Sequence, residues 1–505
     1  MKLCVVGLDC LEPTLVERWL GDLPTFSRLR ALGAWGRMRS CIPPITVPAW
    51  SCMMSSRDPG ALGIYGFRNR TAHTYDGLGF ATADWVKCDR LWDILSAQGR
   101  SCAILGVPGT YPPRPVRGVM VSDFLTPSQE STWTWPPELK EAIRSWLGGE
   151  DYLFDVADFR STDKARILSD IREMTARRFR VARELLTRRR PDFFMMVEMG
   201  SDRIHHGFWH FMDREHRRYE PGPFSSAIHD YYVELDRELE QLLRCIDLAE
   251  TTLLIISDHG GQRLDGGICV NDWLRREGYL VLKHNPPAAG TPLLKCDVDW
   301  ARTRAWAEGG YYARIFLNVR GREPQGTIDP REYERVRGDL GHHLAQIPDD
   351  RGSPLHTVSH VPQRLYPRVE GIAPDLITIF GDLRWRAVGT LGWDAVHIFE
   401  NDTGPDEANH AQNGYFNLVV PGQPAVPEIR TLDILDVAPT LLEALQMPVP
   451  STMQGRPFEF TERPSDEPAQ AAPSADVEKP GAAADYSRQE AVEIEKRLEA
   501  LGYLG

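Results

Sequence analysis

The sequence lacks any long apolar segment. No stretch of about 18 consecutive apolar residues occurs along the chain, so we expect no membrane-spanning helix. The amino terminus MKLCVVGLDC has one lysine and only a short apolar run before Asp9. That run is shorter than the central segment of a secretory signal peptide, so we expect no export signal there either.

The sequence also lacks an excess of basic residues. Lys and Arg number 58 against 71 Asp and Glu, which gives a formal net charge of -13 at pH 7. This balance argues against a general nucleic-acid binder or a protein held on anionic lipid, because both need a positive surface field. It says nothing against a small phosphorylated ligand. Since 505 residues with 42% hydrophobic content allow a large core, we expect an enzyme-sized globular protein.

Cysteine pairs at metal-binding or redox spacing are absent. The nine cysteines lie at positions 4, 10, 41, 52, 88, 102, 245, 269 and 296, and no two of them form a CxxC pair. An odd number without such a pair is typical of reduced, mostly buried thiols. We therefore predict a cytoplasmic protein.

The apolar runs that do occur are short and alternate with helical patterns. The first run, 3–8, precedes an amphipathic stretch over 12–32. Further runs lie at 101–107, 193–197, 253–256, 376–380 and 416–420, and helical patterns at 163–189, 225–246 and 432–446. This alternation predicts an α/β fold, with a mainly parallel central sheet covered by helices on both faces.

Composition divides the rest of the chain. The stretch 285–365 is richer in Pro, Gly and charge and lacks comparable apolar runs, so we expect an inserted subdomain or cap there. This leaves 1–284 and 366–461 as a discontinuous catalytic core. Pro, Ala, Ser and acidic residues over 462–487 predict a flexible linker. Apolar positions at helical spacing predict a terminal helix over 488–505 that docks on the body or on a partner.

Asp258 and His259 place a carboxylate and an imidazole side by side after a branched apolar run, in the segment IISDHGG. In open α/β proteins, ligands bind outside the carboxyl ends of the parallel strands. Carboxylate and imidazole side chains are common metal ligands. The pair therefore predicts part of a metal site at the sheet edge, with partners that other segments must supply.

Two segments near the amino terminus could supply partners. Asp9 follows the first predicted strand, although a single Asp at such a position is more often a cap or turn residue. Thr46, in PPITVPAWSC, precedes a helix that we expect to begin near Pro48 or Ala49. Taken alone, Thr46 is more often an N-cap than a nucleophile. Both roles use the N–H groups and the dipole of a helix N-terminus, which favour negative charge.

Two later segments add further candidates. In MGSDRIHHGFWHF, Asp202 and His206 are four residues apart, so a helix would place them on one face where a metal could bridge them. His205 is the rival ligand, and we otherwise expect His205 and His210 to be packing residues. His410, in EANHAQNG, precedes a strand. Three Asp, three His and one Thr from five segments are more informative together than any member alone.

This ordered set resembles the alkaline phosphatase superfamily, and most closely its type I phosphodiesterase and nucleotide pyrophosphatase branch. The resemblance covers 1–460 and rests on GLDC, ITVPAW, SDRIHH, SDHGG and NHAQNG in the family's order. It implies an alkaline-phosphatase-like fold and two divalent metal ions, commonly Zn²⁺, with Mn²⁺ or Mg²⁺ as alternatives. By resemblance, one ion would be held by Asp9, Thr46, Asp258 and His259, and the other by Asp202, His206 and His410.

Two positions depart from the better-known nucleotide pyrophosphatases. Those enzymes carry an Asn downstream of the nucleophile that helps to hold the phosphoryl oxygens, and the matching stretch here is GIYGFRNR. Asn69 is the substrate-binding candidate by proximity alone. Where many relatives have His before Gly-Ile, this chain has Leu62, which weakens any carry-over of nucleotide specificity.

The charge balance of such a site suits phosphoryl transfer. Two divalent cations bring four positive charges, and three aspartates with a Thr46 alkoxide cancel them, so the site is nearly neutral before a phosphate enters. We therefore predict a metal-dependent phosphodiesterase or nucleotide pyrophosphatase. Thr46 would attack phosphorus in line to give a phosphothreonine intermediate, which is then hydrolysed.

Other functions stay open from the sequence. A phosphomonoesterase or phosphomutase would use the same core. A sulfatase is disfavoured, because that branch converts a Cys or Ser to formylglycine and Thr46 is neither. A non-catalytic, metal-stabilised binding protein would have no use for a nucleophile. The predicted partner is a small-molecule phosphodiester or pyrophosphate, without general nucleic-acid binding, and homo-oligomerisation is left open.

Overall fold

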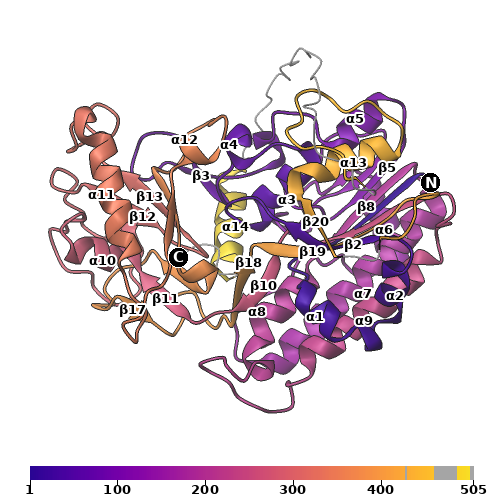
Figure 1. Ribbon diagram of the computed structural model, residues 1–505, viewed down its shortest axis with the longest axis horizontal. Helices are drawn as coiled ribbons and strands as arrows, with labels where there is room; N and C mark the ends of the chain where they lie inside the picture. The colour runs from indigo at the N-terminus through magenta and orange to yellow at the C-terminus, as the bar shows by residue number, and fades with distance from the viewer. Residues whose placement is uncertain (427–428, 460–485, 501–505) are drawn as a thin grey trace.

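The computed structural model describes residues 1–426, 429–459 and 486–500, and these are built around a nine-stranded sheet (Figure 1). Its strands are β1 Leu3–Leu8, β2 Ala34–Arg39, β5 Cys102–Leu105, β6 Gly118–Val121, β7 Thr134–Trp135, β8 Phe193–Glu198, β9 Thr252–Ile256, β19 Asn413–Val419 and β20 Arg430–Asp433. They lie in the order β20-β2-β19-β9-β1-β8-β5-β6-β7. Only β19, against both neighbours, and β7, against β6, pair antiparallel. The predicted mainly parallel sheet is confirmed.

The three central strands are continuous apolar runs because they are buried on both faces. Every residue of β1, β8 and β9 is buried, which is typical of a parallel sheet between two helical layers. In register, Val6 of β1 faces Met196 of β8 on one side and Ile255 of β9 on the other. Since these strands are parallel and in register, their carboxyl ends reach the same edge of the sheet.

Helices cover both faces of the sheet, as predicted (Figure 1). One layer contains α1 Pro13–Arg18, α2 Pro24–Arg30, α6 Leu139–Trp146, α7 Lys164–Arg189, α8 Gly200–Met212 and α9 Ala227–Leu243. The other contains α3 Thr46–Ser55, α5 Leu91–Ala97 and α13 Val437–Ala444, with the single turn α4 Pro59–Leu62 beside α3. The predicted helices at 163–189 and 225–246 correspond to α7 and α9. Helix α3 begins at Thr46 itself, earlier than predicted.

A second core lies beside the main sheet, at the left of Figure 1. Four antiparallel strands, β12 Ala305–Glu308, β13 Ala313–Leu317, β14 Val358–His360 and β15 Leu376–Ile379, pair in the order β12-β13-β15-β14. A three-stranded sheet contains β11 Gly266–Cys269, β16 Trp385–Val388 and β17 His397–Ile398. The helices of this part are α10 Val270–Arg276, α11 Tyr333–Ala345 and α12 Pro362–Leu365.

The second core is wider than the predicted insertion at 285–365, because its buried residues extend from Ile268 to Leu391. The apolar run 376–380 was assigned to the central sheet, and this was wrong: β15 pairs with β13 and β14 instead. Periodicity identifies a buried strand but not the sheet that it joins. The division of the chain into core and cap domains stays a prediction.

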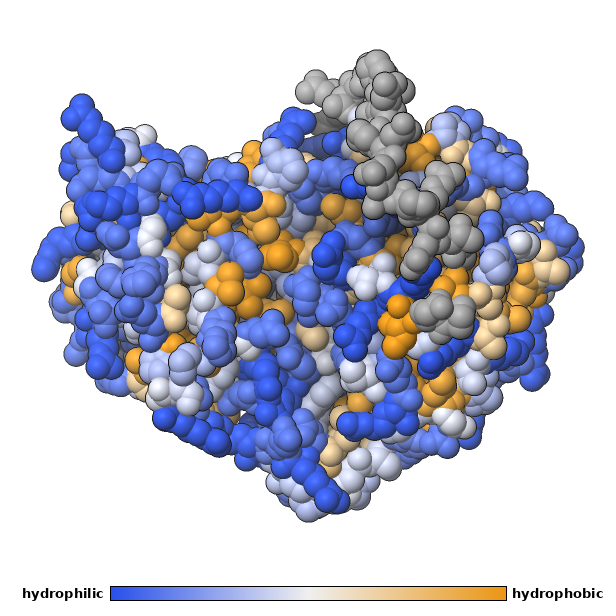
Figure 2. Space-filling view, viewed as in Figure 1, coloured by the Kyte–Doolittle hydropathy of each residue, from blue (hydrophilic) through white to orange (hydrophobic). Residues whose placement is uncertain are grey.

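Smaller elements connect these parts. Two antiparallel two-stranded ladders pair β10 Gly260–Arg263 with β18 Ala408–Ala411, and β3 Arg68–Arg70 with β4 Leu78–Phe80. Short 3-10 turns are η1 Leu20–Asp22, η2 Ala83–Trp85, η3 Leu293–Lys295, η4 Pro330–Glu332, η5 Gly381–Leu383 and η6 Ile434–Asp436. Apolar side chains gather between the two cores on the face shown in Figure 2, and hydrophilic ones follow its outer margin.

The end of the described chain packs on the main core. Helix α14 Arg488–Ala500 buries Ile494 and Leu498 completely, and the ring of Tyr486 stacks on Tyr111 with centroids 5.4 Å apart. The predicted linker at 462–487 lies outside the described residues except for its last two. Among the helices that are described, none has the length and apolar character needed to cross a bilayer.

Helix α2 gives a test of how two helices within one layer are joined. Its first turn has no side-chain cap of its own. Instead, Asp236 of α9 accepts hydrogen bonds from the backbone N–H groups of Thr25 and Phe26, each at 3.0 Å. We expect Asp236→Ala to lower the free energy of unfolding by about 1–2 kcal/mol, the typical loss for a helix cap, measured by urea denaturation.

Glu240→Ala is the matched control on the same helix. Its carboxylate pairs with Arg28 at the surface, and such pairs contribute less than about 1 kcal/mol. Equal losses in the two variants would contradict the capping role of Asp236.

Candidate metal centre

Three neighbouring strands deliver five of the predicted site residues to one edge of the sheet. Strands β9, β1 and β8 are adjacent and parallel. Asp9 follows β1, Asp258 and His259 follow β9, and α8, which contains Asp202 and His206, begins just after β8. Because the carboxyl ends of parallel strands share an edge, these side chains meet although nearly 250 residues separate Asp9 from Asp258.

The next two strands bring the remaining residues to the same edge. Strand β19 is antiparallel to β9, so it begins where β9 ends, and the short strand β18 just before it contains His410. Strand β2 runs antiparallel to β19 and leads, through a Pro-rich turn, to Thr46 at the start of α3. All seven residues predicted from the sequence therefore come together.

The first half of the site contains Asp9, Thr46, Asp258 and His259. His259 Nε2 lies 3.2 Å from Asp258 Oδ2, 3.7 Å from Asp9 Oδ1 and 3.4 Å from Thr46 Oγ1. One imidazole nitrogen thus faces two carboxylate oxygens and a hydroxyl oxygen. Ligand atoms of Asp9, Asp258 and His259 all lie within 4.8 Å of one another, close enough to share a cation.

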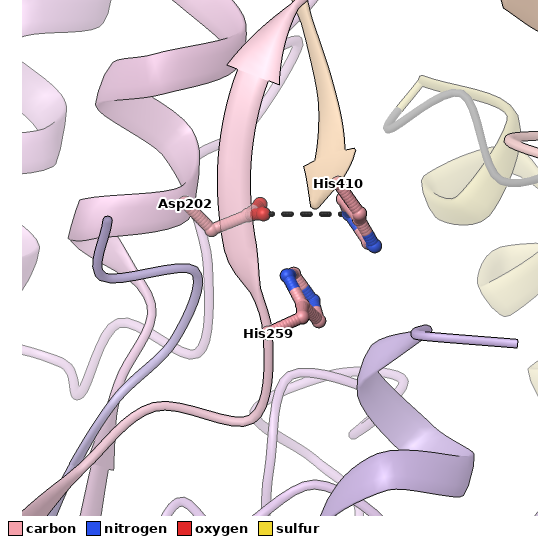
Figure 3. A group of neighbouring side chains, drawn as sticks. All are labelled: Asp202, His259 and His410. Atoms are coloured by element: carbon pink, nitrogen blue, oxygen red, sulfur yellow. Dashed lines mark ion pairs between the residues drawn. The ribbon is translucent and has the colours of Figure 1, made fainter. Parts of the chain in front are cut away.

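The second half contains Asp202, His206 and His410. Asp202 Oδ1 lies 3.2 Å from His206 Nε2 and 3.7 Å from His410 Nε2. Asp202, His259 and His410 point toward one another in Figure 3 and form a second group with ligand atoms within 4.8 Å. The rings of His259 and His410 stack with centroids 3.7 Å apart, so His259 borders both halves of the centre.

Each of the three aspartates has one oxygen held by the protein and one that faces the centre. Asp9 Oδ2 accepts from Trp50 Nε1 at 2.7 Å, Asp258 Oδ1 accepts from the backbone N–H of Cys10 at 3.3 Å, and Asp202 Oδ2 accepts from Arg203. The second oxygens, Asp9 Oδ1, Asp258 Oδ2 and Asp202 Oδ1, are buried without a hydrogen-bond donor. A buried polar atom left in this way is costly, and a cation would satisfy all three.

The three histidines are oriented in the same way. The Nδ1 atom of His259 lies 3.1 Å from the carbonyl oxygen of Gly260, and that of His410 lies 2.9 Å from the carbonyl oxygen of Pro44. His206 Nδ1 lies 2.7 Å from Asp406 Oδ1. Each Nδ1 can therefore donate outward, which leaves Nε2 as a lone-pair donor toward the centre. His410 Nε2 is itself buried without a hydrogen-bond partner.

Burial controls the electrostatics of the centre. It raises the pKa of Asp9 well above the usual value, and the Asp202 carboxylate adds to the rise. Burial and Asp9 act in the same way on the pKa of Asp258. For Asp202, burial opposes ionisation, but the charges of His206 and Arg203 together outweigh it and hold the pKa well below the usual value. Burial lowers the pKa of His259 to about 4. Burial also opposes a charged His206, but Asp202 and Asp406 outweigh it and raise the pKa of that imidazole to about 9, so a cation at its Nε2 would have to displace a proton.

Gly7 leaves room for the indole of Trp50 beneath Asp9. An added Cβ at Gly7 would lie 2.4 Å from the Trp50 ring and 2.8 Å from Val197. Only glycine lets the indole approach the strand closely enough to reach the carboxylate two residues later. The sequence pattern indicated neither the role of Gly7 nor that of Trp50.

Sequence reasoning also missed the residues behind His206. Asp406 accepts from His206 and from Arg160, whose Nη2 lies 2.6 Å away, and all three side chains are buried. Arg203, next to Asp202, is held in turn by Asp155 at 2.6 Å. Arg203 lies in α8, whereas Asp155, Arg160 and Asp406 come from irregular loops without periodicity, which the sequence pattern did not mark.

Three other predicted positions can be placed. His205 Nε2 lies 3.0 Å from the Tyr232 hydroxyl, and burial lowers its pKa to about 3, so it is a packing residue turned away from Asp202. His210 is also buried. Both polar atoms of the Asn69 side chain make local hydrogen bonds. Its Oδ1 accepts from Tyr65 N at 2.7 Å, and its Nδ2 donates to Gly66 O at 3.0 Å. A substrate-binding role for Asn69 stays a prediction.

Comparison with known proteins identifies the family of this chain. The chain matches the family model described as type I phosphodiesterase / nucleotide pyrophosphatase over residues 3–415. A search of curated proteins found no match. Phosphonoacetate hydrolase from Sinorhizobium meliloti 1021, in complex with phosphonoformate, is 16% identical, with a TM-score of 0.56 over 88% of this chain and 95% of that chain. Human ectonucleotide pyrophosphatase / phosphodiesterase 5 is 13% identical, with a TM-score of 0.50, and the match covers 91% of this chain and 97% of that chain.

Structures at such low identity show the fold alone. The fold is that of the alkaline phosphatase superfamily, with a mainly parallel sheet between helical layers. Within it, this chain belongs to the type I phosphodiesterase / nucleotide pyrophosphatase family. It is accordingly a phosphoric ester hydrolase, from a group of metal-dependent enzymes.

The contact between Asp406 and His206 gives a test of the second half. We expect Asp406→Asn to weaken metal binding by about 10- to 100-fold, because the carboxylate fixes the imidazole tautomer and orientation. The affinity can be measured by competition with a chromophoric chelator.

Asp402→Asn is the control in the same loop. It is a carboxylate that accepts from Thr390 at 2.9 Å and pairs with Arg386. An unchanged metal affinity in Asp406→Asn, or an equal loss in the control, would contradict the orienting role.

Proposed function

We propose that this chain hydrolyses small-molecule phosphodiesters or pyrophosphates at a centre of two divalent metal ions, through a phosphothreonine intermediate on Thr46. The observation that supports this most strongly is the position of the Thr46 hydroxyl. It lies at the N-terminus of α3, 3.4 Å from His259 Nε2, beside carboxylate oxygens that have no donor. A helix N-terminus favours the negative charge of both an alkoxide and a phosphate.

The ligand assignment follows the two halves of the site. Asp9, Asp258, His259 and the Thr46 oxygen would hold one ion, and Asp202, His206 and His410 the other. Mixed imidazole and carboxylate ligands suit Zn²⁺ first, while the share of carboxylates also admits Mn²⁺ or Mg²⁺.

Bound ions would lower the pKa of the Thr46 hydroxyl and neutralise charge on the phosphoryl oxygens. Thr46 loses its proton, and Oγ1 forms a bond to phosphorus. The opposite P–O bond breaks, and its electron pair goes to the departing oxygen, which leaves as an alcohol or phosphate after protonation. Water then hydrolyses the phosphothreonine, which restores the hydroxyl and releases a phosphate monoester.

Burial supports this chemistry. The seven predicted site residues are at most 1% exposed, so charge interactions inside the centre are weakly screened. Helix α3 is buried along its whole length, which holds the nucleophile in one place relative to the histidines. Positioning of this kind is a large part of catalysis in phosphoryl transfer.

The remaining expectations belong to the same proposal. The net charge of -13 favours a small substrate over nucleic acid. All nine cysteines are free thiols, which supports the proposed cytoplasmic location. A phosphomonoesterase or phosphomutase would use the same residues, so the assay has to separate these activities.

Removal of the nucleophile tests the proposal. We expect Thr46→Ala to lower the rate of aryl phosphodiester hydrolysis by about 10⁶-fold, the order of loss typical of an enzyme without its catalytic nucleophile. Thr46→Ser keeps a hydroxyl and should retain measurable turnover. Rates are measured on metal-loaded protein with aryl phosphodiester, aryl phosphate and aryl sulfate.

The outcomes of this assay distinguish the proposed function from its alternatives. Wild-type turnover of the diester in preference to the other two supports the proposal, and preference for the monoester would replace it by the phosphomonoesterase alternative. Wild-type activity in Thr46→Ala would exclude Thr46 as the nucleophile.

A further inference from the structure

The second core contributes a tyrosine to the metal centre. Tyr311 lies in the connection between β12 and β13, where it is 2% exposed. Its ring stacks on His206, with centroids 5.2 Å apart and an interplanar angle of 21°, and contacts His410 with centroids 4.3 Å apart. No sequence pattern marked this residue, because it follows two glycines in a segment without periodicity.

The Tyr311 hydroxyl lies against the imidazole of His206, about equally far from its two ring nitrogens. It lies 3.4 Å from His206 Nε2 and 3.5 Å from His206 Nδ1. Arg160 Nη2 donates to the hydroxyl oxygen at 3.4 Å. Because a guanidinium only donates, the phenol proton must point away from it.

The backbone fixes Tyr311 in this place. Gly310 and Ala387 exchange two backbone hydrogen bonds, of 2.8 and 2.9 Å. Asn409, next to a predicted ligand, donates to the Tyr311 carbonyl oxygen at 3.4 Å. A Cβ at Gly309 would lie 2.4 Å from Gly389 N, so glycine permits this close approach. Tyr311 is therefore a fixed wall of the centre.

Two imidazoles separate Tyr311 from the proposed nucleophile Thr46. Thr46 contacts His259, His259 stacks on His410, and His410 contacts Tyr311. In-line displacement places the departing oxygen opposite the attacking one across phosphorus. With Thr46 attacking from the His259 side, the departing oxygen would point toward the half that contains His206 and Tyr311.

We propose that the Tyr311 hydroxyl donates a hydrogen bond to the departing oxygen and so determines which leaving groups this enzyme accepts. The inference rests on the proposed phosphoryl transfer to Thr46. As the P–O bond breaks, its electron pair moves onto the departing oxygen, and the hydrogen bond from Tyr311 stabilises that charge until water protonates it. The phenol keeps its own proton throughout, and the second step, hydrolysis of phosphothreonine, does not involve it.

The test is a series of phosphodiesters that differ only in leaving group, from nitrophenol through phenol to an alkyl alcohol. A donor to the departing oxygen matters most when that oxygen is most basic. For Tyr311→Phe we expect kcat/KM to fall by about 100-fold with the alkyl leaving group, comparable to loss of an oxyanion donor. With nitrophenol the fall should be less than about threefold. The Phe ring preserves the stacking on His206.

Tyr312→Phe is the matched control. The Tyr312 hydroxyl is also buried and donates to the carbonyl oxygen of Tyr65, away from the metal ligands. We expect it to lower kcat/KM equally, if at all, for every leaving group. Metal affinity, measured by chelator competition, should be unchanged in both variants.

The possible failures are distinguishable. If the wild-type enzyme hydrolyses none of the diesters, the proposed function itself fails, and this inference with it. If the wild type is active but Tyr311→Phe lowers all rates by the same factor, or weakens metal binding, Tyr311 only positions His206 and the inference is overturned. A loss that grows with leaving-group basicity supports it.

Discussion

The arrangement of this protein depends on the repulsion among three buried carboxylates. Asp9, Asp202 and Asp258 project from the ends of neighbouring strands into a buried centre. Burial and mutual repulsion raise the pKa of two of them, and one oxygen of each lacks a hydrogen-bond donor. Buried carboxylates crowded in this way need protons or cations to offset their charge, so we expect metal binding to stabilise the fold.

Hydrogen bonds from the surrounding residues orient the proposed ligand atoms. The outward oxygens of the aspartates are held by an indole, a backbone N–H and a guanidinium, and each histidine has its Nδ1 turned to an oxygen. The inward atoms then converge without freedom to rotate. Thr46, the proposed nucleophile, is held in place because it begins a fully buried helix. Such preorganisation removes the cost of reorganising the site during reaction.

The sequence predicted the central sheet and all seven converging residues, because ligands that follow apolar runs must share the carboxyl edge of a parallel sheet. The resemblance to the family assigns these residues to two metal ions. Periodicity could not reveal that 376–380 joins the second sheet, since a buried strand has the same pattern in either. Nor could it find Asp406 or Tyr311, which irregular segments bring to the site through contacts more than a hundred residues away along the chain.

The central claim is that these residues form two cation sites, one on each side of His259. Elemental analysis of metal-loaded protein after removal of free metal tests it most directly. The account predicts two ions per chain in the wild type and in Thr46→Ala, and one in Asp9→Asn and in His410→Ala, which each damage a different half. A single ion in the wild type, or two ions retained in both ligand variants, would contradict it.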